Sequence, residues 1–233
     1  MPWLRNQLSS LGVSKPTSVQ ENCIPAILEG RDCLGVAKTG QGKTFAFVIP
    51  ILQTLSENPY GVYCLVLTPT RELALQIGDS FNVLGKPMGL RVVVVTGGRD
   101  TIRQSQDLDR RPHIIVATPG RLADHIENNS TFSLSKLKYL VLDEADRLLE
   151  GEGFYHIQRP PFPRAHSVHL FILSASSFCP PFRLVYLFCG GHSVKMQAMQ
   201  VCLPVVAGNT RHVCQKNSCF VFVSLPSWWA GAL

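Results

Sequence analysis

The sequence predicts an α/β fold with a doubly wound parallel sheet over residues 1–150. Short apolar runs of strand length alternate there with segments of helical length and spacing. The runs 62–67 and 92–95 are apolar without alternation, as expected of strands that are covered on both faces. The 233 residues, 45% apolar and 16% charged, are enough to bury a core and argue against wholesale disorder.

The expected elements follow one another in a repeating strand–helix order. Strands are predicted at 32–37, 62–67, 91–96, 113–117 and 139–142, with helices between them such as 43–55, 71–84 and 101–108. Repeated units of this kind form parallel sheets with helices on both faces. We therefore expect one domain over residues 1–150, with an extension to about residue 176 left open.

The chain changes character near residue 150. Residues 1–150 carry 16 basic and 15 acidic residues, whereas 151–233 carry six basic residues and Glu152 alone, so almost all of the net charge of +6 lies in the last third. That third is rich in Cys, Phe and Pro and has no sustained helical period, which predicts a divergent, irregular tail. The overall charge therefore says little about whether the first two thirds bind nucleic acid.

Several classes of protein are disfavoured by simple patterns. No apolar run approaches the ~18–20 residues of a membrane-spanning helix, and the first ten residues lack a signal peptide's basic flank and apolar stretch. The eight cysteines include no Cys-x-x-Cys pair, which disfavours a zinc site and a disulfide framework. We expect a soluble intracellular chain with reduced thiols and no membrane partner.

A glycine-rich segment follows the first expected strand and opens the next helix. It is Ala37-Lys38-Thr39-Gly40-Gln41-Gly42-Lys43-Thr44, the phosphate-binding loop pattern with Ala at its first position. Small residues let backbone N–H groups surround phosphate oxygens, and the helix N-terminus adds its positive end. In this pattern Lys43 reaches the β- and γ-phosphates and the Thr44 hydroxyl ligates Mg²⁺.

An acidic run, Asp143-Glu144-Ala145-Asp146, follows the strand expected at 139–142. A carboxylate at the end of a buried strand, in the same sheet as a phosphate loop, is where Mg²⁺ is held. Asp143 is the expected Mg²⁺ partner, and Glu144 is placed to orient or deprotonate an attacking water. The catalytic candidates are therefore Lys43, Asp143 and Glu144.

These segments together resemble the DEAD-box family of ATP-dependent RNA helicases. The segment from Gly12 to Gln20 is similar to the family's Q motif, and further matching strings follow in family order: Pro69-Thr70-Arg71-Glu72-Leu73-Ala74, Gly97-Gly98 and Thr118-Pro119-Gly120-Arg121. The resemblance covers about residues 4–150. It implies a RecA-like domain that binds ATP with Mg²⁺, in which Pro16, Thr17 and Gln20 complete the nucleotide site and Gln20 recognises the adenine edge.

The resemblance also implies an RNA-binding face. Two of the strings lie where a strand ends and a helix begins, so free N–H groups there can hold a sugar–phosphate backbone without reading bases. The expected RNA contacts are Thr70, Arg71, Gly98, Thr118, Gly120 and Arg121. The residues around the motifs resemble those of the family's ribosome-assembly branch. This resemblance implies pre-ribosomal RNA as the substrate, protein cofactors as partners, and a location in the nucleus, in the nucleolus, with the cytoplasm as the alternative.

A string in the last third extends the resemblance. Leu170-Phe171-Ile172-Leu173-Ser174-Ala175-Ser176 is similar to the family's strand and Ser-Ala-Thr motif, with Ser176 in place of Thr. True correspondence would make Ser174 and Ser176 couple nucleotide state to RNA binding through Asp146, and chance similarity in a Ser-rich tail is the alternative.

The family's second helicase domain is not expected in residues 151–233. That domain supplies an arginine finger, worth ~10³–10⁵ in rate in related nucleotide hydrolases, and no His-Arg-x-Gly-Arg-like string follows residue 150. The leading hypothesis is an ATP-hydrolysing RNA helicase whose turnover is slow in this chain. The alternatives are a non-catalytic module that binds ATP, RNA or a protein partner, and a poorly folded product with an exposed sheet edge.

Overall fold

The computed structural model describes residues 1–57, 61–128, 133–150, 169–174, 182–190, 193–201, 210–215 and 218–223. Strands and helices alternate over the first 150 residues. The strands there are β1 Asp32–Ala37, β2 Cys64–Leu67, β3 Val92–Val95, β4 Ile114–Ala117 and β5 Tyr139–Asp143. The helices are α1 Pro2–Ser10, α2 Ser18–Leu28, α3 Lys43–Leu55, α4 Arg71–Gly85, the 3₁₀ helix η1 Lys86–Met88, α5 Thr101–Asp109, α6 Pro119–Asn128 and α7 Ala145–Glu150.

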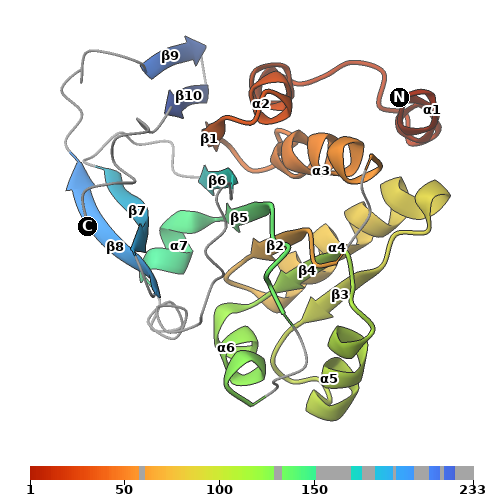
Figure 1. Cartoon of the computed structure of the whole chain (residues 1–233). Coiled ribbons are helices and arrows are strands. Elements are labelled where there is room, and N and C mark those ends of the chain that lie inside the picture. The colour runs from red at the N-terminus through yellow and green to blue at the C-terminus, as the bar shows by residue number, and fades with distance from the viewer. Residues whose placement is uncertain are drawn as a thin grey trace.

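These five strands and a sixth, β6, form a parallel sheet. Their order is β3-β4-β2-β5-β6-β1, where β6 is His169–Ser174 from the last third of the chain. All five neighbouring pairs in this series are parallel. The predicted doubly wound α/β fold is therefore confirmed, and the sheet takes one central strand from beyond residue 150 (Figure 1).

The register sets the carboxyl ends of the strands level with one another. Ala117 of β4 is paired with Leu67 of β2 on one side and with Val95 of β3 on the other. On the far side of the sheet, Leu173 of β6 is paired with Asp143 of β5, and the next residue, Ser174, is paired with Val36 of β1. The segments that follow β1 to β5 consequently leave the sheet along one edge.

The described part of the tail consists of strands. β6 lies where the similarity to the family's strand and Ser-Ala-Thr motif predicts a strand, whereas the other strands of the tail were not predicted. Besides β6, these are β7 Phe182–Gly190, β8 Ser193–Val201, β9 Thr210–Gln215 and β10 Ser218–Val223. β10 is antiparallel to β1 and to β9, and β7 and β8 form a separate two-stranded sheet. Backbone pairing between strands needs no regular apolar periodicity. The sequence pattern therefore predicted an irregular tail and did not reveal β7 to β10.

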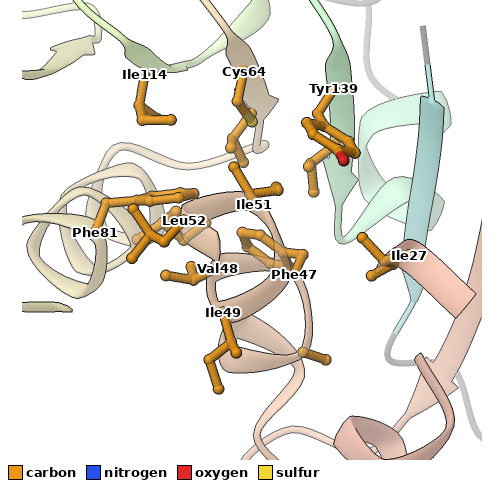
Figure 2. Close-up of a cluster of buried hydrophobic side chains, with 14 of the residues drawn as sticks. Ile27, Phe47, Val48, Ile49, Ile51, Leu52, Cys64, Phe81, Ile114 and Tyr139 are labelled. Carbon is orange, nitrogen blue, oxygen red and sulfur yellow. The ribbon is translucent and has the colours of Figure 1, made fainter. Parts of the chain in front are cut away.

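Two apolar cores cover the opposite faces of the parallel sheet. Cys64 and Val66 of β2 pack with side chains of α2, α3 and α4, whereas Leu65 and Leu67 of the same strand pack with side chains of α5, α6 and α7. Figure 2 shows the first core, in which Phe47 of α3 lies near Phe81 of α4, with 6.2 Å between the ring centroids. Alternate residues of each central strand are therefore buried on both faces, as in other doubly wound sheets.

No helix in the described part of the chain has the length and apolar character needed to cross a membrane.

The core around Phe81 gives a test of the fold. Phe81 is fully buried, whereas Val83, two residues further along α4, is 45% exposed. We expect Phe81→Ala to lower the free energy of unfolding by about 3–5 kcal/mol, because it removes buried apolar surface and leaves a cavity. The matched change Val83→Ala should cost about 0.5 kcal/mol or less. Urea unfolding of both variants measures the difference, and equal losses would contradict the packing described here.

Candidate functional site

The phosphate-binding loop joins β1 to α3 and is built on two glycines with left-handed backbone. Gly40 has φ of +81° and Gly42 has φ of +79°, a conformation that favours glycine. The loop is closed locally, because the Lys38 N–H donates to Oε1 of Gln41 at 3.0 Å. Ala37 is buried at the end of β1, Lys38, Thr39 and Gly40 are exposed, and Lys43 and Thr44 are half-buried in the first turn of α3.

Lys43 points back across the loop. Its Nζ donates to the carbonyl oxygen of Ala37 at 2.7 Å. Burial lowers the pKa of the Lys43 ammonium, while the carboxylates of Asp143, Glu144 and Asp146 act in the opposite direction. The acidic run after β5 is therefore close enough to Lys43 to change its pKa, although Lys43 and Asp143 are 100 residues apart in the sequence.

Gln20 links the start of α2 to the phosphate loop. Its amide is buried, with Oε1 accepting from the Thr17 N–H at 3.1 Å and Nε2 donating to the Gly42 carbonyl at 3.1 Å. The contact is tight, because a Cβ at Gly42 would lie 2.5 Å from Gln20 Nε2. Pro16 and Thr17 are exposed beside it. Gln20 and Thr17 thus lie against the loop, and Pro16 precedes Thr17 in the chain. Adenine recognition by Gln20 stays a prediction.

Asp143 ends β5 and is 5% exposed. Burial raises its pKa to about 6, and the nearby Lys43 ammonium offsets part of that rise. The carboxylate accepts from the Glu144 N–H, with 3.2 Å between Oδ1 and N. A buried carboxylate facing a lysine is a site where a divalent cation would replace the missing solvation.

The two other acids of the run have distinct surroundings. Glu144 has φ of +50°, a strained value for a residue with a side chain, and its Oε2 accepts from Arg147 Nη1 at 3.0 Å. Asp146 lies in the first turn of α7, and its Oδ1 is buried without a hydrogen-bond partner among the described residues. Strain and an unsatisfied buried oxygen at neighbouring positions are features typical of functional sites.

A second group of predicted residues lies along the ends of β2, β3 and β4. Thr70 caps α4, its hydroxyl accepting from the Leu73 N–H at 3.3 Å. Arg121, in the first turn of α6, donates from Nη1 to the Thr101 hydroxyl at 2.7 Å and has Asp124 at 3.9 Å. Thr118 is half-buried just before α6, and a Cβ at Gly120 would meet nothing within 4 Å. In this group Arg71 and Gly98 are exposed and the other residues are half-buried, and Arg71 and Arg121 carry their positive charges at helix N-termini.

The structure thus gathers the predicted residues into two groups on one edge of the sheet. One surrounds the ends of β1 and β5, and the other follows the ends of β2, β3 and β4. Ser174 ends β6, which lies between β1 and β5, whereas Ser176 lies outside the described residues. Sequence analysis missed Arg147 and Thr101, which partner Glu144 and Arg121. The i, i+3 spacing of Glu144 and Arg147 on α7 was a usable signal for the first. No sequence pattern indicates the second, because Thr101 and Arg121 meet only through the fold.

The raised pKa of Asp143 predicts a pH dependence of stability. A carboxyl whose folded pKa is about 6 stabilises the folded chain while protonated, and that contribution is lost as the pH rises from about 4 through 6. Relative to Asp143→Asn, the wild-type free energy of unfolding should fall by up to about 3 kcal/mol across this range, at about 1.4 kcal/mol per pH unit. Urea unfolding at pH 4 and pH 7.5 measures this.

The variant Asp143→Glu serves as the control for that experiment, because it keeps a carboxyl group at the end of β5. It should retain a fall in stability over the same range. Parallel stability curves for the wild type and Asp143→Asn would contradict the desolvation of this carboxylate.

Comparison with known proteins gives consistent similarities. The sequence model of the DEAD/DEAH box helicase family matches residues 17–177. The chain is 64% identical over 148 residues to the human protein named probable ATP-dependent RNA helicase DDX49, covering 64% of this chain and 31% of that protein. It is 52% identical over 169 residues to the ATP-dependent rRNA helicase RRP3 of Yarrowia lipolytica, covering 72% and 35%.

The fold is similar to that of a solved helicase. A crystal structure of a hypothetical ATP-dependent RNA helicase from Sulfolobus tokodaii matches with a TM-score of 0.64 and 32% sequence identity, over 76% of this chain and 51% of that one. The chain spans about a third of the length of the curated relatives. Because the family model covers well over half of the chain and the structural match shows the same RecA-like fold, this chain belongs to the DEAD/DEAH box helicase family.

Proposed function

We propose that residues 1–150 of this chain, with an extension to about residue 176, form the nucleotide-binding domain of an ATP-dependent RNA helicase, and that the rest of residues 151–233 is a divergent tail. One observation carries the proposal: Lys43 of the phosphate loop and the acidic run after β5 meet at the same edge of the sheet, where each affects the other's pKa. A lysine and a carboxylate placed in this way are the pair that phosphoryl transfer from ATP requires.

In the proposed site Lys43 exchanges its bond to the Ala37 carbonyl for one to the β- and γ-phosphates. Its partial burial keeps competing water away, and the left-handed glycines leave backbone N–H groups free for phosphate oxygens. Gln20, with Pro16 and Thr17, is the proposed contact for the adenine ring, because Gln20 is hydrogen-bonded to Gly42 of the loop that would hold the phosphates. The remaining nucleotide contacts proposed are Ala37, Lys38, Thr39, Gly40, Gln41, Gly42 and Thr44.

The donors available for Mg²⁺ fit that ion. The Thr44 hydroxyl and the Asp143 carboxylate are hard oxygen ligands, and Mg²⁺ bound to ATP commonly uses one or two such groups together with phosphates. Bound there, the ion would neutralise phosphate charge. Asp143 serves this role only when ionised, so the site favours pH values above about 6.

Glu144 is the proposed residue that orients or deprotonates the attacking water. Arg147 engages Oε2 and leaves Oε1 without a hydrogen bond among the described residues. The backbone of Glu144 is left-handed whereas that of Asp143 is not, so the two neighbouring carboxylates differ in backbone conformation. Two adjacent acids can in this way serve two tasks, one for the metal ion and one for water.

We propose that RNA lies along the ends of β2, β3 and β4. The exposed Arg71, the half-buried Arg121 and the N-termini of α4, α5 and α6 lie there, which suits a phosphate backbone. Contacts would come from Thr70, Arg71, Thr118, Gly120 and Arg121, with Gly98 beside them. Coupling between the two groups would run through Asp146, whose buried Oδ1 needs a donor, and Ser174 and Ser176 are the proposed partners.

The substrate and location follow from the kind of relative that the chain resembles. One relative is named an rRNA helicase, and we propose pre-ribosomal RNA as the substrate class, protein cofactors as further partners and the nucleolus as the location, with the cytoplasm as the alternative. The alternative function is a non-catalytic module that binds ATP, RNA or a protein partner, because residues 151–233 contain no His-Arg-x-Gly-Arg-like string that could supply an arginine finger. RNA-stimulated ATP hydrolysis that disappears in Glu144→Gln supports the enzyme, and binding without turnover supports the module.

Thermal unfolding with and without Mg-ATP tests the nucleotide site directly. At about 100 times its dissociation constant, a ligand stabilises the folded state by about 2.7 kcal/mol. For a chain of this size we expect Tm to rise by several degrees, at about 2–4 °C per kcal/mol. Lys43→Ala should abolish the rise because the phosphate ligand is lost.

Lys86→Ala is the matched control, since it removes an exposed lysine in η1, away from the loop. It should leave the ATP-induced rise in Tm unchanged. A cooperative transition that ATP does not move would refute the proposed site, and the lack of any cooperative transition would support the poorly folded alternative.

A further inference from the structure

Two buried thiols meet between α2 and β1, which pack against each other (Figure 1). Cys23 lies on α2 and Cys33 on β1, and their side chains are hydrogen-bonded to each other. Both belong to the core on the α2 side of the sheet, with 1% and 4% of their surface exposed. Both are free thiols. The pair is therefore a place where one new covalent bond could join a helix to the central sheet.

The local sequence brings the two thiols together. Cys23 belongs to the buried face of α2, which also includes Val19, Ala26 and Ile27. After the helix, Gly30 has φ of +73° and the Arg31 N–H donates to the Ala26 carbonyl at 3.0 Å, so the chain turns back into β1. Cys33 is the first buried position of that strand, in which half-buried and buried residues alternate. Ten residues of sequence are in this way folded into a direct contact.

The thiol pair lies between the two elements that hold the phosphate loop. Cys23 follows Gln20 by three residues, and Gln20 donates to the Gly42 carbonyl at 3.1 Å. Cys33 is in the same strand as Ala37, where the loop begins. The contact of Gln20 with the loop has little spare room, since a Cβ at Gly42 would lie 2.5 Å from Nε2. A shift of α2 relative to β1 would therefore be transmitted to the loop.

The surroundings of the pair keep it reduced while the helix is in place. The hydrogen bond to Cys23 and burial both raise the pKa of the Cys33 thiol. Because the thiolate is the reactive form, a buried and protonated thiol reacts slowly. Oxidation consequently requires a transient opening between α2 and β1 that admits an oxidant and lets a thiol ionise. Disulfides of this transient kind are the ones that occur inside cells.

We propose that Cys23 and Cys33 form a reversible disulfide with oxidised glutathione as the oxidant, and that this bond weakens nucleotide binding. One protein thiolate attacks a sulfur of oxidised glutathione, which forms a mixed disulfide and releases a glutathione thiolate. The second protein thiolate attacks the protein sulfur of the mixed disulfide and releases the second glutathione. The two protein thiols lose two electrons and two protons, and oxidised glutathione gains them to become two thiols.

The expected effect on the nucleotide site follows from geometry. A disulfide holds its sulfur atoms about 2.05 Å apart, which is closer than two hydrogen-bonded thiols approach. Forming the bond therefore draws α2 toward β1 and disturbs the contact between Gln20 and Gly42. This effect rests on the nucleotide site proposed above. By linkage, bound ATP should disfavour the disulfide by the same factor as the disulfide weakens ATP binding.

Peptide mapping of the full chain tests the bond itself. The reduced chain is incubated with oxidised glutathione, its remaining thiols are blocked with N-ethylmaleimide, and the product is digested with trypsin. Because trypsin cuts after Arg31 and does not cut between Lys15 and Pro16, the disulfide joins peptide 6–31 to peptide 32–38. We expect mass spectrometry to find this joined pair and dithiothreitol to remove it. Its absence from the oxidised wild type would overturn the proposal.

Two variants serve as controls for the mapping. Cys64→Ala removes another buried thiol of the same core, whose pKa is raised by burial alone, and it should leave the joined pair unchanged. Cys33→Ala should lose the joined pair. Because the mapping gives its result on the wild type, it does not depend on how well either variant folds.

Titration with a fluorescent ATP analogue in Mg²⁺ tests the effect on nucleotide binding. We expect Kd to be about fivefold higher for the oxidised wild type than for the reduced one, the lower end of the usual coupling range. In glutathione buffers, saturating Mg-ATP should lower the equilibrium constant for disulfide formation by the same factor. Cys33→Ala keeps the cysteines of residues 151–233, and treatment with oxidised glutathione should leave its Kd unchanged. An equal loss of affinity in Cys33→Ala would overturn the proposal, because other thiols would then be responsible.

The two measurements separate failure of this proposal from failure of the nucleotide site. If the joined pair forms and Kd is the same in both redox states, the effect on binding is overturned and the nucleotide site stands. If the reduced wild type binds no Mg-ATP, the nucleotide site and the effect on it are both overturned, while the mapping still decides whether the disulfide forms.

Discussion

The level register of the parallel strands is the constraint on which both groups of candidate residues depend. Because Ala117 pairs with Leu67 and with Val95, the turns after β2, β3 and β4 start at the same height. The same holds on the other side, where Asp143 pairs with Leu173 and Val36 pairs with Ser174. Burial on both faces fixes this register, because a slip of one residue would exchange the two cores. Residues far apart in sequence are placed side by side as a result.

Burial also sets the electrostatics of the nucleotide group. Lys43 and Asp143 are both partly removed from water, so desolvation is the largest influence on each, and each partly compensates the other. Among the described residues, Lys43 donates its hydrogen bond to the Ala37 carbonyl oxygen and not to a carboxylate, and the pKa of Asp143 stays raised. In the function that we propose, a triphosphate with its metal ion would supply the opposite charge that each of them lacks.

The RNA-binding face that we propose places positive charges where the helix dipoles disfavour them. Arg71 and Arg121 both lie in the first turns of helices, where the helix dipole disfavours cations. The fold holds them there by local contacts, glycine backbone for Arg71 and the Thr101 hydroxyl for Arg121. Acidic residues at these positions would stabilise the helices better. The RNA-binding function that we propose accounts for the two arginines, because they would contact phosphates.

The sequence by itself determined the strand–helix alternation, the phosphate loop and the acidic run, since each depends on residues that are close together in the chain. The strand 32–37 and the helix 43–55 have the predicted bounds, because apolar runs, glycines and helix starts are local signals. Only the tertiary structure decided that β6 lies between β1 and β5, that Gln20 holds Gly42, and that Arg71 covers Gly98. These contacts depend on strand order and on close approach of distant segments, which no local pattern specifies.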